Sequence, residues 1–166
     1  MRVMGIDPGS NCTGFGIVEE IKSDLHAIHW SSVRSSPKHS FPERLKRIYD
    51  ELVLAMEKFQ PDVVAVEDLF YATNVKTVIK LAQTRGVILL AAVNCGIELA
   101  EYSPLEIKQS VVGYGRADKN QVCDMLSVLL RLEEKPDPFD ASDALAVAIC
   151  HIHNAGLQQK IKLAQG

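Results

Sequence analysis

Apolar residues in the first 36 positions fall into short runs separated by turn residues. The runs "RVMGID", "TGFGIVEE" and "LHAIHWSSVRS" follow one another at hairpin-like distances, and "DPG" after the first is typical of a tight turn. The pattern predicts three antiparallel strands. Gly14 and Gly16 in the second run indicate that another segment approaches the backbone of this strand closely on one face.

Helical spacing begins after Pro42. Apolar residues recur every three or four positions and predict a surface helix with one buried stripe: Leu45, Ile48, Leu52, Met56 and Phe59. The β-branched run "VVAV" then predicts a central strand that is covered on both faces and closed by Glu67. A second helical pattern occupies residues 74–94 and ends at "NCG".

The rest of the chain alternates one strand with three helices. We expect a strand at 97–103, a short helix capped by Ser103, a flexible "GYGRA" connector and a helix capped by Asp118. The Ala-rich last helix is predicted to begin near Asp140 and to lie close against the sheet. This order predicts an α/β fold with a five-stranded mixed sheet whose first three strands meander.

The length of 166 residues fits a single domain. We expect the compact domain to span residues 1–157 and the polar segment 158–166 to be a frayed tail. No apolar run approaches the roughly 20 residues of a membrane span, and the N-terminus lacks the apolar core of a signal peptide. The sequence therefore predicts a cytoplasmic protein without a membrane segment.

The positions of the cysteines and of the charged residues limit which metal ligands and binding partners the protein can have. The scattered Cys12, Cys95, Cys123 and Cys150 are typical of reduced packing residues, so a metal would be held by oxygen. The net charge of −3 argues against a nucleic-acid-binding protein, but residues 69–97 contain no acid. The lysines and arginine within that range leave two readings open, a local basic face or a solvated helix surface.

Four acids stand at the ends of predicted elements. Asp7 and Glu67 end two strands, and Asp140 and Asp143 share one face of the first turn of the last helix. Converging carboxylates repel one another unless divalent cations neutralise them, and oxygen ligands select Mg²⁺ or Mn²⁺. Each acid also has a simpler explanation, since Asp7 suits a turn and the helix acids suit a cap. Glu67 is harder to explain, because an unpaired buried carboxylate costs several kcal/mol.

Five segments together resemble the RuvC family of Holliday-junction resolvases, and the resemblance runs through most of the chain. The segments are "GIDPGSNCTGFG", "FQPDVVAVEDLF", "KLAQTRGVILLAAVN", "IKQSVVGYGRADKNQV" and "DASDALAVAI". The resemblance implies a ribonuclease H-like fold and a structure-selective endodeoxyribonuclease. Its products would be paired symmetric nicks with 5′-phosphate and 3′-hydroxyl ends. It also implies that the catalytic, metal-binding acids are Asp7, Glu67, Asp140 and Asp143, which would hold two Mg²⁺ ions per subunit, with Mn²⁺ as a substitute.

The same resemblance extends to DNA contacts and partners. It places Phe70 at the DNA-contacting edge of the site, with core packing as the alternative, and Lys108 and Lys119 near the scissile phosphate. Arg116 is a further DNA-binding candidate, with a solvated loop charge as the alternative. Residues 74–94 match the dimer-forming helix of the family. The implied partners are a four-way DNA junction, a second copy of the chain and a RuvA-RuvB-type branch-migration complex.

Two other functions remain open from sequence. The "GIDPGSNCTGFG" hairpin also resembles the phosphate-binding hairpin of the actin-like ATPase superfamily, although such enzymes close two domains over the nucleotide. A catalytically silent relative that only binds junctions is the third reading. His151 and His153, two positions apart on a helix, should face different neighbours and have structural roles. The role of Ser142 stays open.

Overall fold

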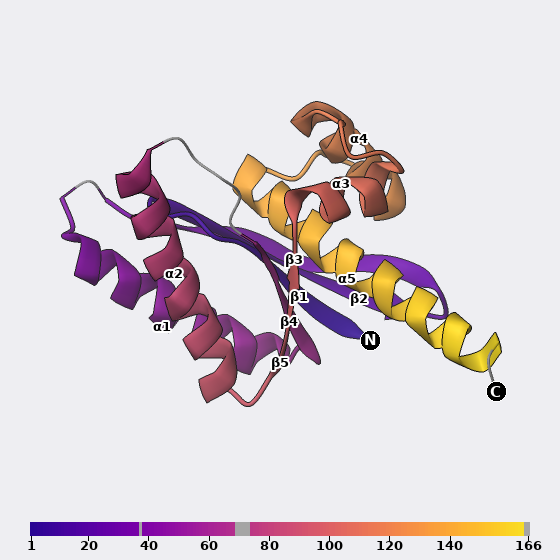
Figure 1. The fold of residues 1–166 in the computed structure, drawn as a ribbon, viewed down its shortest axis with the longest axis horizontal. Helices are drawn as coiled ribbons and strands as arrows, with labels where there is room; N and C mark the ends of the chain where they lie inside the picture. The colour runs from indigo at the N-terminus through magenta and orange to yellow at the C-terminus, as the bar shows by residue number, and fades with distance from the viewer. Residues whose placement is uncertain (37, 69–73, 165–166) are drawn as a thin grey trace.

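The computed structural model describes residues 1–36, 38–68 and 74–164. This part of the chain contains five strands and five helices (Figure 1). In chain order they are β1 (Arg2–Asp7), β2 (Cys12–Ile21), β3 (Asp24–Arg34), α1 (Phe41–Phe59), β4 (Val63–Glu67), α2 (Val75–Asn94), β5 (Glu98–Tyr102), α3 (Pro104–Val112), α4 (Lys119–Leu129) and α5 (Phe139–Ala164).

The strands form one mixed sheet in the order β3-β2-β1-β4-β5. β2 runs antiparallel to both β1 and β3, whereas β4 is parallel to both β1 and β5. The predicted meander of the first three strands and the predicted central position of β4 are therefore confirmed. Since β1 and β4 are parallel neighbours, their carboxyl ends place Asp7 and Glu67 at the same edge of the sheet.

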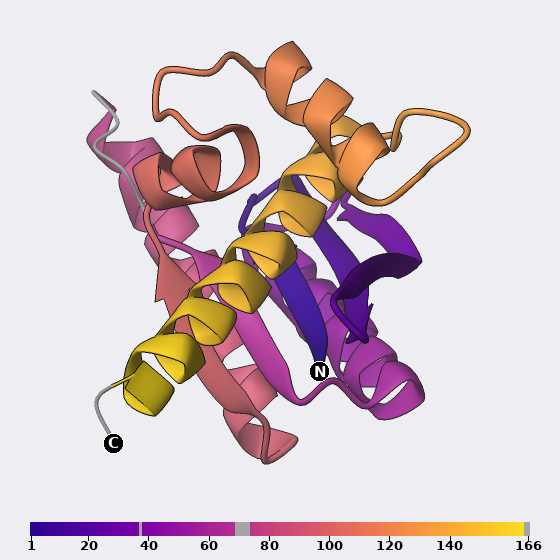
Figure 2. The same ribbon diagram turned by 90° about the vertical axis from the view of Figure 1, so that its right-hand side faces the viewer.

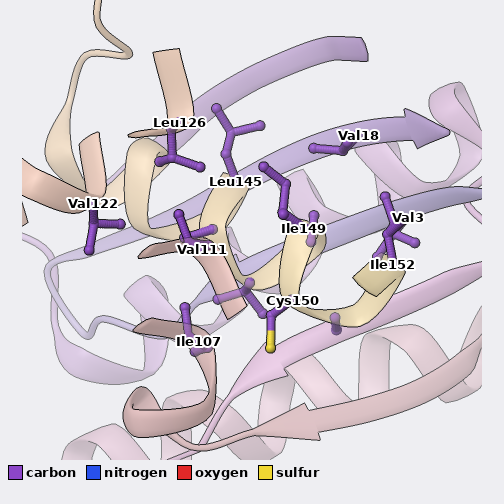
Figure 3. Packing of buried hydrophobic residues seen from close by; sticks show 14 of the residues in the cluster. Val3, Val18, Ile107, Val111, Val122, Leu126, Leu145, Ile149, Cys150 and Ile152 are labelled. Atoms are coloured by element: carbon purple, nitrogen blue, oxygen red, sulfur yellow. The ribbon is translucent and has the colours of Figure 1, made fainter. Parts of the chain in front are cut away.

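Helices cover both faces of the sheet. α1 and α2 lie on one face, and α5 crosses the other face with α3 and α4 beside it (Figures 1 and 2). Each face buries its own apolar cluster. On the α5 face, Leu145 and Ile149 pack among side chains from β1, β2, α3 and α4 (Figure 3). Burial of both faces explains why β4 reads as an uninterrupted apolar run.

The glycines of β2 set how closely α5 approaches the sheet. A Cβ atom at Gly14 would lie 1.9 Å from the backbone oxygen of Asp140, and one at Gly16 would lie 2.7 Å from the Leu145 side chain. Only glycine fits at Gly14, because the obstructing atom belongs to backbone. The predicted close approach is confirmed, and it seats the first turn of α5 directly on β2.

Two helices differ from their sequence patterns. On α2 the residues buried against the sheet are Thr84, Ile88, Ala91 and Ala92. Several apolar residues of the same helical pattern are exposed instead, among them Val75, Ile79, Leu90 and Val93. α5 continues to Ala164, beyond residue 157 where the sequence predicted the frayed tail to begin. The exact domain boundary stays a prediction. Over the described ranges, no helix combines the length and apolar character needed to cross a bilayer.

Candidate functional site

A cavity of about 260 Å³ opens where β1 and β4 end and α3, α4 and α5 meet. Its polar lining consists of three carboxylates and two ammonium groups, contributed by Asp7, Glu67, Asp143, Lys108 and Lys119. Its apolar wall consists of Pro104, Ile107, Val122 and Ala146. This wall keeps water from part of the lining and so strengthens electrostatic interactions among the charged groups.

Asp7 carries the largest electrostatic perturbation of the site. Burial, together with the nearby charges of Glu67, Asp143 and Asp140, raises the pKa of its carboxyl group to about 8, against a smaller opposing effect of Lys119. Burial and the Asp143 charge also raise the pKa of Glu67, while its hydrogen bond with Asp7 opposes this. Two adjacent buried carboxyl groups resist simultaneous ionisation, so without a cation they share a proton.

Asp143 reaches the cavity from the first turn of α5, where an ammonium group neutralises it. Lys119 Nζ, at the start of α4, donates a hydrogen bond to Asp143 Oδ2 over 2.6 Å. This contact raises the pKa of Lys119. The pairing joins α4 to α5 across 24 positions of sequence, which is a relation that no local spacing reveals.

Asp140 lies near the cavity but outside the set of residues that line it. Its charge still raises the pKa of Asp7, but its carboxylate also accepts a hydrogen bond from the Cys12 thiol on β2, and this bond contributes to a raised pKa of Cys12. The close packing of Asp140 over Gly14 explains this position. The structure therefore gathers Asp7, Glu67 and Asp143 in one cavity and places Asp140 on its β2 side.

The basic candidates divide between the cavity and the surface. Lys108 on α3 and Lys119 on α4 line the cavity. Arg116 is exposed on the connector between α3 and α4 and lies outside the set of lining residues within the described ranges. Phe70 falls outside the described residues.

Ser142 and the two histidines lie away from the cavity lining. Ser142 is buried on α5. The Tyr102 hydroxyl lies 2.9 Å from His151 Nδ1, and the Ser110 hydroxyl lies 3.1 Å from His153 Nδ1. Different neighbours for the two histidines match the prediction from their spacing.

The donor set suits a hard cation, although the carboxylates are already partly engaged. Among the residues that the structure describes, no three His, Cys, Asp or Glu side chains are placed to share one ion. In this structure Asp7 is hydrogen-bonded to Glu67, and Asp143 is paired with Lys119. Loss of one proton and separation of the Lys119–Asp143 pair would free three oxygen ligands, the type that Mg²⁺ and Mn²⁺ prefer.

One further ionic cluster lies at the end of β4 on the α2 face of the sheet, and the sequence analysis did not predict it. Arg85 on α2 pairs with Asp68, the residue after Glu67, and with Glu101 on β5. The sequence showed Arg85 only as one of three cations in an acid-free range. Its partners could be found only from the parallel pairing of β4 with β5 and the packing of α2 against them.

Comparisons with known proteins support this fold and identify the family. The family profile "Crossover junction endodeoxyribonuclease RuvC" matches residues 3–151. A protein of that name from Syntrophomonas wolfei is 49% identical over 154 residues, which cover 93% of this chain and 90% of the relative. The structure of Thermus thermophilus RuvC in complex with a Holliday junction substrate superposes with a TM-score of 0.90 at 33% identity, over 95% of this chain and 96% of that one.

A more distant structure supports the fold alone. The yeast mitochondrial Holliday junction resolvase aligns with a TM-score of 0.73 at 16% identity, over 98% of this chain and 82% of its own. The ribonuclease H-like fold that the motifs implied is thereby confirmed. With a family profile and close relatives that match nearly its whole length, the chain belongs to the RuvC family of crossover junction endodeoxyribonucleases.

Proposed function

We propose that this protein is a metal-dependent endodeoxyribonuclease that resolves four-way DNA junctions in recombination and repair. The observation that carries the proposal is the joint lining of one cavity by three carboxylates and two lysines in a member of the RuvC family. Family membership favours this reading over an ATPase half-domain. Hydrolysis of the P–O3′ bond would leave 5′-phosphate and 3′-hydroxyl ends.

The proposed cofactor is Mg²⁺, with two ions per subunit and Mn²⁺ as a substitute. Asp7, Glu67, Asp140 and Asp143 would hold the ions, with Asp140 reaching them from the β2 side of the site. The raised pKa of Asp7 supports this assignment, because burial and the neighbouring carboxylates both disfavour its ionised form in the metal-free protein, and a bound cation would offset this. When bound, divalent cations stabilise the charge that develops on a phosphate and on the departing oxygen.

The protein's own groups would then bind and orient the phosphate. Asp7 and Glu67 give up their shared proton, and Lys119 leaves Asp143 to face the DNA. The ammonium groups of Lys108 and Lys119 attract the phosphate, while the wall at Ile107 and Val122 limits the entry of bulk water. We assign Arg116 to the DNA backbone further along. The predicted contact of Phe70 with the DNA stays a prediction. Phe70→Ala should slow cleavage more than it weakens junction binding.

The outer face of α2 supports a homodimer. Six apolar or small residues spaced by three or four positions are exposed on this helix: Val75, Ile79, Ala82, Gly86, Leu90 and Val93. We call this set the α2 seam. A Cβ at Gly86 would meet nothing within 4 Å, so the middle of the seam leaves room for a second helix to approach. A two-fold dimer would present two sites to a junction with the same symmetry and so make paired nicks.

The cellular setting is also part of the proposal. A RuvA-RuvB-type branch-migration complex and a cytoplasmic location stay predictions.

The decisive experiment compares a synthetic four-way junction, plain duplex and an RNA/DNA hybrid with Mg²⁺, with Ca²⁺ and without metal. We expect paired nicks only in the junction and only with Mg²⁺. Asp7→Asn should abolish cleavage yet keep junction binding, because one negative charge fewer lowers the repulsion of phosphate. Junction binding without cleavage by the unaltered protein would identify a silent relative, and equal cleavage of all three substrates would contradict junction selectivity.

A further inference from the structure

Arg85 is a largely buried cation that connects α2 with the residue after β4 and with β5. It lies on α2, where its side chain is 18% exposed. One guanidinium nitrogen, Nη2, lies 3.4 Å from Asp68 Oδ1 and also donates a hydrogen bond to Glu101 Oε2 on β5. Arg85 therefore connects the helix to the residue that follows Glu67 and to the neighbouring strand.

Strand alternation explains why these acids face α2 rather than the cavity. Val66 is paired with Glu101 and Glu67 with Tyr102 in the parallel ladder of β4 and β5. Successive side chains of a strand point to opposite faces. Val66 belongs to the apolar cluster on the α1 and α2 face, so Glu101 shares that face, whereas Glu67 lines the cavity on the α5 face.

A backbone hydrogen bond also holds the chain at this point. The Asp68 amide donates to the Tyr102 carbonyl over 2.8 Å, one residue beyond the end of β4. Together, this bond and the Arg85–Asp68 ion pair hold the chain immediately after Glu67. The direction of the Glu67 carboxylate depends on the backbone between Val66 and Asp68, so both contacts act on it.

We infer that Arg85 is a positioning residue that holds the end of β4, and with it the Glu67 carboxylate, through its ion pairs with Asp68 and Glu101. Its catalytic consequence rests on the proposed nuclease function. An ion pair of a mostly buried arginine with two half-exposed carboxylates is weak evidence for stabilisation of the fold. The planar guanidinium suits simultaneous contact with two carboxylates, which a lysine ammonium reproduces less well.

The direct test uses the metal-free protein and needs no cleavage. Amide hydrogen exchange is compared between the unaltered chain and Arg85→Gln, with the Asp62 amide, which donates to the Arg2 carbonyl over 2.8 Å, as the internal reference. Protection of the Asp68 amide should fall by about tenfold or more while that of Asp62 stays unchanged. Arg131→Gln is the matched control, since Arg131 pairs with Asp24 at the far end of β3 and should affect neither amide.

The catalytic test measures single-turnover junction cleavage across a range of Mg²⁺ concentrations. Arg85→Gln should need on the order of tenfold more Mg²⁺ for half-maximal rate, with junction affinity in Ca²⁺ unchanged. Arg85→Lys should recover part of this loss.

Several outcomes would overturn the inference. Unchanged protection of the Asp68 amide in Arg85→Gln would do so, as would loss of stability and rate with an unaltered Mg²⁺ dependence, which would make Arg85 a purely structural residue. Weaker junction binding alone would make it a phosphate contact. If the unaltered protein cleaves no junction but Asp68 loses protection in Arg85→Gln, the positioning role stands and the proposed function fails.

Discussion

Lys119 Nζ lies 2.6 Å from Asp143 Oδ2, so a cation of the protein itself occupies one of the carboxylates that would hold metal. The positive charge of the same ammonium opposes the rise in the pKa of Asp7 and Glu67 that burial and the neighbouring carboxylates cause. Lys119 thus partly neutralises the cavity before any ion arrives. Under the proposed function, metal and Lys119 would compete for Asp143, and Lys119 would become available to phosphate when the metal binds.

Replacing Lys119 with methionine should separate metal binding from cleavage. Affinity for Ca²⁺ or Mn²⁺, measured by isothermal titration calorimetry, should rise by about threefold to tenfold because a nearby positive charge is removed. Junction cleavage should fall by about 100-fold because the ammonium no longer faces the phosphate. Lys108→Met, which alters the other lysine of the cavity, should slow cleavage with a smaller change in metal affinity. Weaker metal binding by Lys119→Met would contradict the competition.

The raised pKa of Asp7 predicts a pH-dependent stability of the metal-free protein. Between its ordinary value of 3.8 and about 8, the folded protein holds a proton on Asp7 that the unfolded chain has released. The free energy of unfolding therefore falls as pH rises through this window. Asp7→Asn removes the penalty, so in EDTA it should stabilise the protein relative to the unaltered chain at pH 8 but little at pH 4.

Urea unfolding at several pH values would measure this difference, which we expect to be on the order of several kcal/mol at pH 8. Glu134→Gln, which removes an exposed carboxylate, should leave the pH profile unchanged. Excess Mg²⁺ should reduce the advantage of Asp7→Asn, since the bound ion would stabilise the ionised carboxylate. A pH-independent difference between Asp7→Asn and the unaltered chain would show that Asp7 does not carry the proton.

The sequence predicted the fold well because local patterns and topology agree in this chain. The uninterrupted apolar run before Glu67 identified a strand covered on both faces, and the burial of Ala65 in one apolar cluster and of Val64 and Val66 in the other bears this out. Helix caps were also readable, since Ser103 and Asp118 accept hydrogen bonds from backbone amides at the starts of α3 and α4. Such features depend on neighbours within a few residues.

Long-range relations could not be read from the sequence. The Lys119–Asp143 and Arg85–Asp68 pairs join segments whose approach is set by helix packing. The outward face of α2 was equally hidden, because helical periodicity identifies an apolar stripe without saying whether the sheet or a partner covers it. Asp140 and Asp143 were expected to act alike from their spacing. Their shared metal-binding role stays a prediction, but the sequence did not show that Asp143 lines the cavity while Asp140 lies on its β2 side, next to Cys12.

A glycine pair offers a test of how α5 is seated. Gly14→Ala would force a Cβ into the Asp140 carbonyl, so we expect a loss of about 3 kcal/mol or more in the free energy of unfolding. Junction cleavage should fall as well, because the first turn of α5 carries Asp140 and Asp143. Gly156→Ala is the matched control on the same helix, where an added Cβ meets nothing within 4 Å. It should stabilise the protein by about 0.5 to 1 kcal/mol, and equal effects of both changes would contradict the close packing.

Charge introduced into the α2 seam should split the proposed dimer without unfolding the chain. Ile79 is 52% exposed, so Ile79→Glu costs the isolated subunit little but would bring two buried carboxylates together in a two-fold interface. Sedimentation equilibrium should show the dimer dissociation constant rise by at least about tenfold, equivalent to roughly 1.4 kcal/mol. On a plasmid that extrudes a cruciform, the variant should yield singly nicked circles instead of linear product, since paired incisions need two subunits. Leu54→Glu on α1, where Leu54 is 60% exposed, controls for an added surface charge. A dimer that Ile79→Glu leaves intact would place the interface elsewhere.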